Sequence, residues 1–203
     1  MSGLRLAAVF GFYPHKLGFC GPQDPLDTKT IFDFISGKSV PEQKVRNILE
    51  RFESAFLYYK LIAKKNNIKD PFDEKVVKAY WIGNDFLEKV SHKDLENLVH
   101  NEFAKKDIKI PKGSVAHHSF HVLVVGSVTG RIELKDNLLD LCRITWGRAI
   151  NQKEVSWNTN IVPEIKTTDM VAVHWNNIVA VLSDQDVDCL TKFTNITINS
   201  LRQ

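Results

Sequence analysis

Cysteine is scarce in this sequence, and no two of its three cysteines form a CxxC pair. Cys20, Cys142 and Cys189 lie far apart along the chain, and an odd number cannot all be paired within it. This usage is typical of proteins whose thiols stay reduced, whereas secreted domains use cysteine in disulfide frameworks. We therefore expect a cytoplasmic protein.

The sequence also lacks an apolar run long enough to cross a bilayer. The stretch LRLAAVFGFY is too short, contains Arg5 and has no small-residue cleavage pattern. The net charge of +3 is mild, and the lysines are spread along the chain. We expect neither a membrane nor a nucleic acid as a partner.

The composition is that of an ordinary globular chain. Its 203 residues, 43% hydrophobic and 25% charged, are enough to bury a substantial core. No repeat, low-complexity tract or change in composition marks a flexible linker. We expect residues 1–203 to form a single domain.

Helix signals dominate residues 24–106, which we predict to be a helical half. Each expected helix starts at a capping residue, often followed by proline or by an acidic residue three positions later. Apolar residues then recur at spacings of three and four, which gives each helix a face to bury. The expected helices start at Asp24, Ser39, Asp70 and Ser91, the second running to about residue 65 and the third to Val90.

The pattern changes after Pro111, and residues 114–203 are predicted to be a β-rich half. The segment SVAHHSFHVLVVGSV predicts a long strand because it is rich in β-branched residues, and TGR near residue 130 predicts a turn. CRITWGRAI, EVSWNTNIV and DMVAVHW predict strands, DNLLDL a helical turn and NNIVAVL a helix. Ser183 and Asp186 predict a closing helix. The fold class is α+β: about four N-terminal helices, a small, mostly antiparallel β-sheet and a C-terminal helix.

The densest group of potential metal ligands is AHHSFH, which holds His117, His118 and His121. On a strand, His117 and His121 would share a face but lie roughly 13 Å apart, too far to share one ion. On a helix, the same spacing would bring them to about 6 Å and allow chelation. Because a strand is predicted, a metal site here needs further ligands, such as Cys20, His15 or His174. The alternative is that these histidines are ordinary core or strand-end residues.

Cys20 is the candidate nucleophile, and it is also a candidate metal ligand. It lies in LGFCGPQD between two glycines, just before the helix that starts at Asp24, where backbone N–H groups favour a thiolate. A catalytic role needs a base, for which His117, His121 and His174 are candidates. No cysteine-protease pattern surrounds Cys20. The alternative is a tight turn with a buried cysteine.

Two later segments supply candidate ligand-binding residues. Arg143, in CRITWGR with Trp146, could hold an anionic group through paired hydrogen bonds, or pair with an acid of the helical half. His174 follows an apolar run and precedes Trp175. It could face a cleft as a base or ligand, or simply end a strand.

Five blocks in order resemble an uncharacterised family of domain-of-unknown-function proteins. The blocks are LGFCGP, DPFDEKVVKAYWIGNDFLEKV, HHSFHVL, CRITWGR and VAVHWNNI. The resemblance implies a genomic context near nickel–iron hydrogenase maturation genes, and so a metalloenzyme client as partner. It points to Cys20, Tyr80, Trp81, Asn84, His117, His118, His121, Arg143, Trp146, His174 and Trp175 as family-typical positions without giving any of them a role.

Three functions are compatible with these features. The first is an accessory or maturation-type factor for a metalloenzyme, which binds a transition metal ion or small ligand through Cys20 and the histidines. The second is an enzyme with Cys20 as nucleophile, a histidine base and Arg143 on an anionic substrate. The third is an interaction module, or a homodimer, that uses an exposed face around Tyr80 and Trp81. We favour the first, because mixed cysteine and histidine suit a soft or borderline metal and no complete catalytic signature is present.

Overall fold

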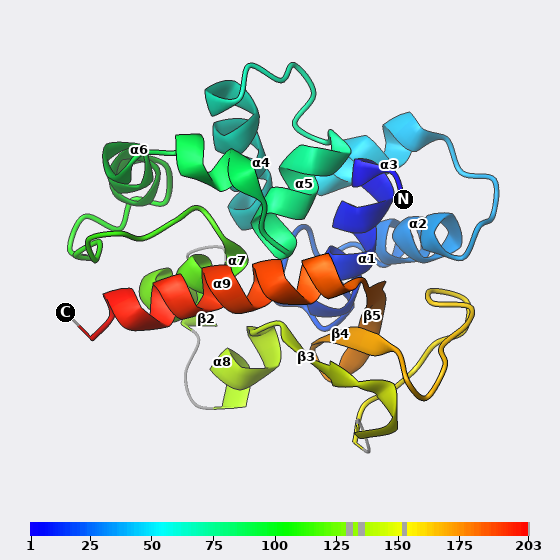
Figure 1. Ribbon diagram of the computed structural model, residues 1–203. Coiled ribbons are helices and arrows are strands. Elements are labelled where there is room, and N and C mark those ends of the chain that lie inside the picture. The colour runs from blue at the N-terminus through cyan, green and yellow to red at the C-terminus, as the bar shows by residue number, and fades with distance from the viewer. Residues whose placement is uncertain (129–131, 134–136, 152–153, 203) are drawn as a thin grey trace.

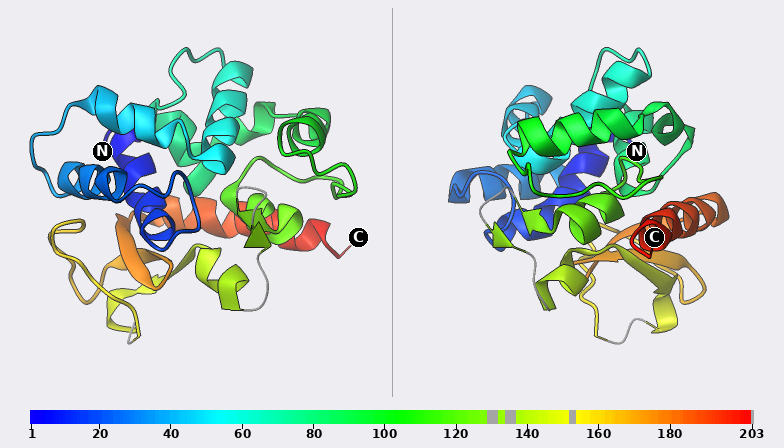
Figure 2. Two further views of the ribbon diagram at one scale, coloured as in Figure 1. Left: turned by 180° about the vertical axis from the view of Figure 1, so that it is seen from behind. Right: turned by 90° about the vertical axis from the view of Figure 1, so that its left-hand side faces the viewer.

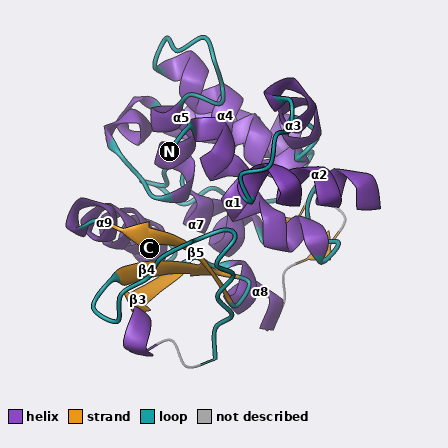
Figure 3. Ribbon diagram, turned by 90° about the vertical axis from the view of Figure 1, so that its right-hand side faces the viewer, coloured by secondary structure: helices purple, strands orange, loops and turns teal. Residues whose placement is uncertain are grey.

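The computed structural model describes residues 1–128, 132–133, 137–151 and 154–202, and it places a layer of helices over a small antiparallel sheet (Figure 1). Helix α1 (Gly3–Lys16) lies between the helical layer and the sheet (Figure 3). The helical layer consists of α2 (Pro25–Ile35), α3 (Glu42–Leu49), α4 (Glu53–Lys65), α5 (Glu74–Trp81), the 3₁₀ helix η1 (Asp85–Lys89), α6 (His92–Asn97) and the π-helix η2 (Leu98–Glu102). The predicted α+β class is confirmed.

The second part of the chain contains the sheet and the closing helix. Strand β4 (Met170–His174) pairs with both β3 (Thr145–Arg148) and β5 (Asn177–Leu182), and all these pairs are antiparallel. Helix α9 (Asp184–Ser200) crosses one side of the molecule and packs against β5 and α7 (Figure 2). The remaining elements are α7 (His118–Phe120), the π-helix η3 (His121–Val125), β1 (Ser127–Val128), β2 (Ile132–Glu133), α8 (Asn137–Cys142) and the 3₁₀ helix η4 (Ala149–Asn151).

Local capping signals place several helix starts correctly. The Asp24 carboxylate accepts a hydrogen bond from the Leu26 amide, and Asp73 rather than Asp70 caps α5. Both predicted capping boxes that start at Ser91 and Ser183 form. The box predicted at Ser39 is wrong, because α3 starts after Pro41 without a side-chain cap.

Two predicted helices are shorter than expected. The helix expected to run to residue 65 is broken at Phe52, whose ψ of 83° is not helical. The next one ends at Trp81 instead of Val90, close to Gly83, whose φ is +100°. A side chain at Gly83 would collide with the Phe193 ring of α9. Both breaks therefore follow from packing between distant segments, which local helix propensity does not register.

Helix α1 was not predicted. Twelve of its fourteen residues are buried, and Ser2 caps it by accepting a hydrogen bond from the Arg5 amide. A helix that is buried on all sides has no polar face, so its sequence lacks the amphipathic period that reveals surface helices. For this reason LRLAAVFGFY reads only as an apolar run.

The strand predicted for SVAHHSFHVLVVGSV is wrong over most of its length, because His118–Val125 is helical. His117 caps this turn, with its Nδ1 accepting a hydrogen bond from the Ser119 amide at 3.3 Å. Gly126 ends it in the left-handed conformation, at φ 62°. A short, fully buried apolar segment cannot be assigned to strand or helix from periodicity alone. The turn predicted at TGR lies outside the described residues.

The helix predicted for NNIVAVL is also wrong, since Asn177–Leu182 is strand β5. Trp175 and Asn176 have φ angles of 53° and 56° and form a two-residue turn between β4 and β5. Two consecutive positive φ angles are typical of the tight turn that matches strand twist. This hairpin fixes His174 at the end of β4. The strand predicted for EVSWNTNIV is reduced, among the described residues, to an isolated bridge from Ser156 to Asn177.

Candidate functional site

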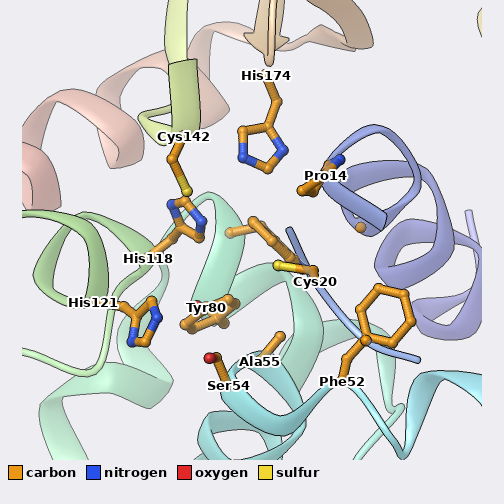
Figure 4. Close-up of a pocket in the computed structure, with 13 residues that line it drawn as sticks. Pro14, Cys20, Phe52, Ser54, Ala55, Tyr80, His118, His121, Cys142 and His174 are labelled. Carbon is orange, nitrogen blue, oxygen red and sulfur yellow. The ribbon is translucent and has the colours of Figure 1, made fainter. Parts of the chain in front are cut away.

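A small pocket lies where α1, the helical layer, α7, α8 and the end of β4 meet (Figure 4). Its volume is about 30 Å³, which is room for an ion or for one or two water molecules. The residues that line it are Gly11, Pro14, Cys20, Gly21, Phe52, Ser54, Ala55, Tyr80, Trp81, His118, His121, Cys142 and His174.

Three potential metal ligands converge at one side of this pocket. One side-chain ligand atom from each of His118, Cys142 and His174 lies within 4.8 Å of the other two. They come from α7, the end of α8 and the end of β4, and they are only 4%, 4% and 1% exposed. Three elements distant in sequence therefore deliver two imidazoles and a thiol to one buried point.

The two imidazoles present nitrogen atoms that lack partners. His174 Nδ1 donates a hydrogen bond to the Phe10 carbonyl oxygen at 2.8 Å, which leaves Nε2 with its lone pair. Neither His174 Nε2 nor His118 Nδ1 has a hydrogen bond of normal geometry among the described residues, although both atoms are buried. The Cys142 backbone lies near enough to the His174 ring to counter part of the fall in its pKa. A buried polar atom left without a partner typically costs about 1–3 kcal/mol. Such atoms are expected where a ligand binds.

Burial sets the protonation of this cluster. It lowers the pKa of His174 from 6.5 to about 4 and holds the pKa of His118 well below its usual value. Burial also raises the pKa of the Cys142 thiol well above its usual value, and the charge of Cys20 adds to this effect. At neutral pH both imidazoles are therefore neutral, which is the form that coordinates metals.

Trp81 forms the wall behind the two histidines. Its ring stacks on His118 with centroids 4.5 Å apart and lies 5.6 Å from the His174 ring. Its Nε1 donates a hydrogen bond to the Tyr59 hydroxyl at 2.5 Å. Trp81 and Tyr80 are only 4% and 1% exposed. The expected exposed face around these two aromatic residues is therefore absent, and the hypothesis of an interaction module built on it is wrong.

A tight turn after α1 carries Cys20 to the pocket. His15 Nδ1 donates to the Cys20 carbonyl oxygen at 3.0 Å, and the Phe19 ring stacks on Trp175 with centroids 4.4 Å apart. Gly18 and Gly21 have φ angles of +86° and +70°, which other residues adopt only with strain. Figure 4 shows the Cys20 side chain pointing into the pocket from the side opposite Cys142.

Gly21→Ala is expected to destabilise this turn strongly. An added Cβ would lie 2.6 Å from Phe52 Cε1, in addition to the left-handed strain of roughly 1–2 kcal/mol. Gly113→Ala is the matched control, because its φ is +84° but no atom lies within 4 Å of the added Cβ. In urea unfolding, Gly21→Ala should lose clearly more stability than Gly113→Ala. Equal losses would show that the Phe52 contact imposes no constraint.

The structure separates the other two histidines of AHHSFH from the cluster. His121 lines the pocket but is not one of the three convergent ligands, and its Nδ1 lies 3.4 Å from the Tyr58 hydroxyl. His117 does not line the pocket. Its ring faces Phe193 of α9, and burial lowers its pKa to about 3.

Of the candidates from CRITWGR and VAVHW, only His174 lines the pocket. Arg143 forms an ion pair with Asp140 at 3.6 Å and, like the half-buried Trp146, does not line the pocket. Trp175 supports the Cys20 turn through Phe19. Cys142 was not among the predicted site residues. A lone cysteine at the end of a short helix carries no spacing signal, so only proximity in space identifies it.

A comparison with protein families matches residues 1–159 to the model of a family of unknown function, DUF6390. The predicted resemblance to an uncharacterised family is confirmed by this match. His174 follows the matched segment in the sequence. No curated protein and no solved structure matches the chain. Among the described residues, no helix combines the length and apolar content needed to span a membrane.

Proposed function

Because the chain belongs to DUF6390, a family of unknown function, we propose its function from the site itself: it binds one zinc-class transition metal ion. The ligands are His118 Nδ1, the Cys142 thiolate and His174 Nε2. Two imidazoles and a thiolate form a donor set that suits zinc and its borderline neighbours.

The observation that carries this proposal is the pair of buried nitrogen atoms without partners beside a buried thiol. The three ligand atoms all lie within 4.8 Å of one another, and the edges of a zinc tetrahedron are about 3.5 Å for bonds of about 2.0–2.3 Å. Binding would therefore need these atoms to approach one another by no more than about 1.3 Å. The ion would relieve the unsatisfied nitrogens, so loading would be coupled to folding stability.

The hydrogen bond from His174 to Phe10 supports the same assignment. Metal-ligating histidines usually donate their other ring N–H to a carbonyl or carboxylate, which fixes the tautomer and the ring orientation. Here the Phe10 carbonyl of α1 takes that role at 2.8 Å. His174 is therefore already oriented with Nε2 toward the pocket.

The protonation of the cluster favours coordination over nucleophilic catalysis by Cys20. A general base works best when its pKa lies near the operating pH. The pKa of His174 is lowered to about 4 and that of His118 still lies well below neutrality. The candidate anion-binding residue Arg143 also lies outside the pocket. Metal binding needs neutral imidazoles and no anion site, and it would release the proton of the Cys142 thiol.

Titration with a metal ion tests this proposal directly. The metal-free protein is titrated with Co²⁺ as a spectroscopic substitute for Zn²⁺, and thiolate-to-metal charge transfer and stoichiometry are measured. We expect one equivalent in the wild type, and an affinity at least about tenfold lower, or about 1.4 kcal/mol, in His118→Gln, His174→Gln and Cys142→Ser.

His92→Gln and Cys189→Ser are the matched controls. His92 lies on α6 and Cys189 on α9, and neither lines the pocket. Both variants should bind Co²⁺ as the wild type does. A wild-type protein without charge transfer, or three pocket variants that bind as tightly as the wild type, would refute the proposed site.

A further inference from the structure

Cys20 is the most exposed of the residues that line the pocket. Thirteen residues line it, and twelve of them are buried, whereas Cys20 is partly exposed. The three ligand residues beyond it are at most 4% exposed. Cys20 is therefore the lining residue that an ion from solvent can reach in this conformation.

Cys20 is held in this position from both sides of the turn. His15 binds its carbonyl oxygen at 3.0 Å, and the second ring nitrogen of His15 lies 3.0 Å from the Thr28 hydroxyl of α2. Phe19 stacks on Trp175, the residue that follows the ligand His174. The turn is thus fixed both to the helical layer and to the strand end that carries a ligand.

The pocket contains two thiols. Cys20 and Cys142 both line it, and its volume is only about 30 Å³. An ion bound to Cys20 would therefore lie in the same small pocket as Cys142. Most of the pocket surface is apolar, so a hydrated ion would lose its water there at high cost. Direct exchange from one thiolate to the next avoids a bare ion.

We propose that Cys20 is the acceptor thiol of the metal site, which takes the ion from a thiol-bound donor such as a zinc–glutathione complex and passes it to Cys142. This inference rests on the proposed function. The metal–sulfur bond of the donor breaks as the metal–Cys20 bond forms, and the Cys20 proton goes to the released donor thiolate. The ion then moves to the Cys142 thiolate, and the Cys142 proton returns to Cys20. No oxidant or reductant takes part.

Exchange kinetics test the proposal. Metal-free wild type, Cys20→Ser and Cys189→Ser are mixed with zinc–glutathione, and loading is followed by tryptophan fluorescence because Trp81 stacks on His118. Release is followed in an excess of a chromogenic chelator. We expect Cys20→Ser to load and release about tenfold more slowly, a barrier change of about 1.4 kcal/mol, while its affinity changes much less. Cys189→Ser should behave as the wild type.

Two results would overturn the acceptor role. Loading of Cys20→Ser at the wild-type rate would show that the ion takes another path. Faster release with a large loss of affinity would make Cys20 a permanent ligand, which leaves the metal site itself intact. Failure of the wild type to bind zinc would instead refute the proposed function. Thermal unfolding of each variant confirms that the compared proteins are folded.

Discussion

Lowering the pH from 7 to 5 is expected to reduce the free energy of unfolding of the metal-free protein by at least about 4 kcal/mol. The cause is the burial of neutral histidines. Burial lowers the pKa of His117 to about 3 and that of His174 to about 4. In the unfolded chain, both take up protons near pH 6.5. Between pH 6.5 and 4 the unfolded state therefore binds more protons, and stability falls as the pH falls.

Each of these histidines contributes about 1.4 kcal/mol per pH unit in that window, or about 2 kcal/mol between pH 7 and 5. His118 acts in the same direction, because burial also lowers its pKa. A loss of this size is a large part of a typical folding free energy of about 5–15 kcal/mol.

Urea unfolding at pH 7, 6 and 5 in the presence of a chelator measures the effect. His117→Gln should reduce the slope of the free energy of unfolding against pH by the equivalent of about one bound proton, whatever its effect on stability at pH 7. A free energy of unfolding that stays constant over this range would contradict the burial of neutral histidines.

Excess Zn²⁺ is expected to raise the stability of the wild type by about 2.7 kcal/mol at one hundred times the Kd. An ion that binds the folded state alone shifts the folding equilibrium by mass action, and the ligands converge only in the folded chain. For a chain of this size, the Tm should rise by roughly 5–10 °C. Differential scanning calorimetry with and without Zn²⁺ measures the shift.

His174→Gln should remove this stabilisation, because it removes one of the three ligands. Cys189→Ser should retain it in full, since Cys189 does not line the pocket. If His174→Gln were stabilised by zinc as much as the wild type, the ion would bind elsewhere. Stabilisation that is lost in both variants would indicate a nonspecific effect on the thiols.

Several features of the fold follow from short-range patterns. The capping boxes at Ser91 and Ser183 form as predicted, because each depends on hydrogen bonds within four residues. The break at Phe52 has no such local signal, since no glycine or proline interrupts the helix there. Its cause is the packing of the Phe52 ring against Gly21 and His15.

The candidate site depends on a segment, His118–Val125, for which a strand was predicted and a helix is found. On a strand, His118 would lie on the face opposite His117 and His121. As the first residue of α7, it instead faces the pocket, while His117 turns toward α9. The segment is buried on all sides, so its residues show no period that separates helix from strand. The residue types and their spacing therefore indicate His118 and His174 as candidates but do not predict that they converge.

By itself, the sequence determined the α+β class, the order of helices before sheet and the main capping positions. These depend on periodicity and on hydrogen bonds between near neighbours. The tertiary structure alone decided that His118, Cys142 and His174 meet, and that Cys20 is the partly exposed residue of their pocket. Contacts between residues so far apart are set by the packing of α1, α7, α8 and β4, and no local spacing encodes them.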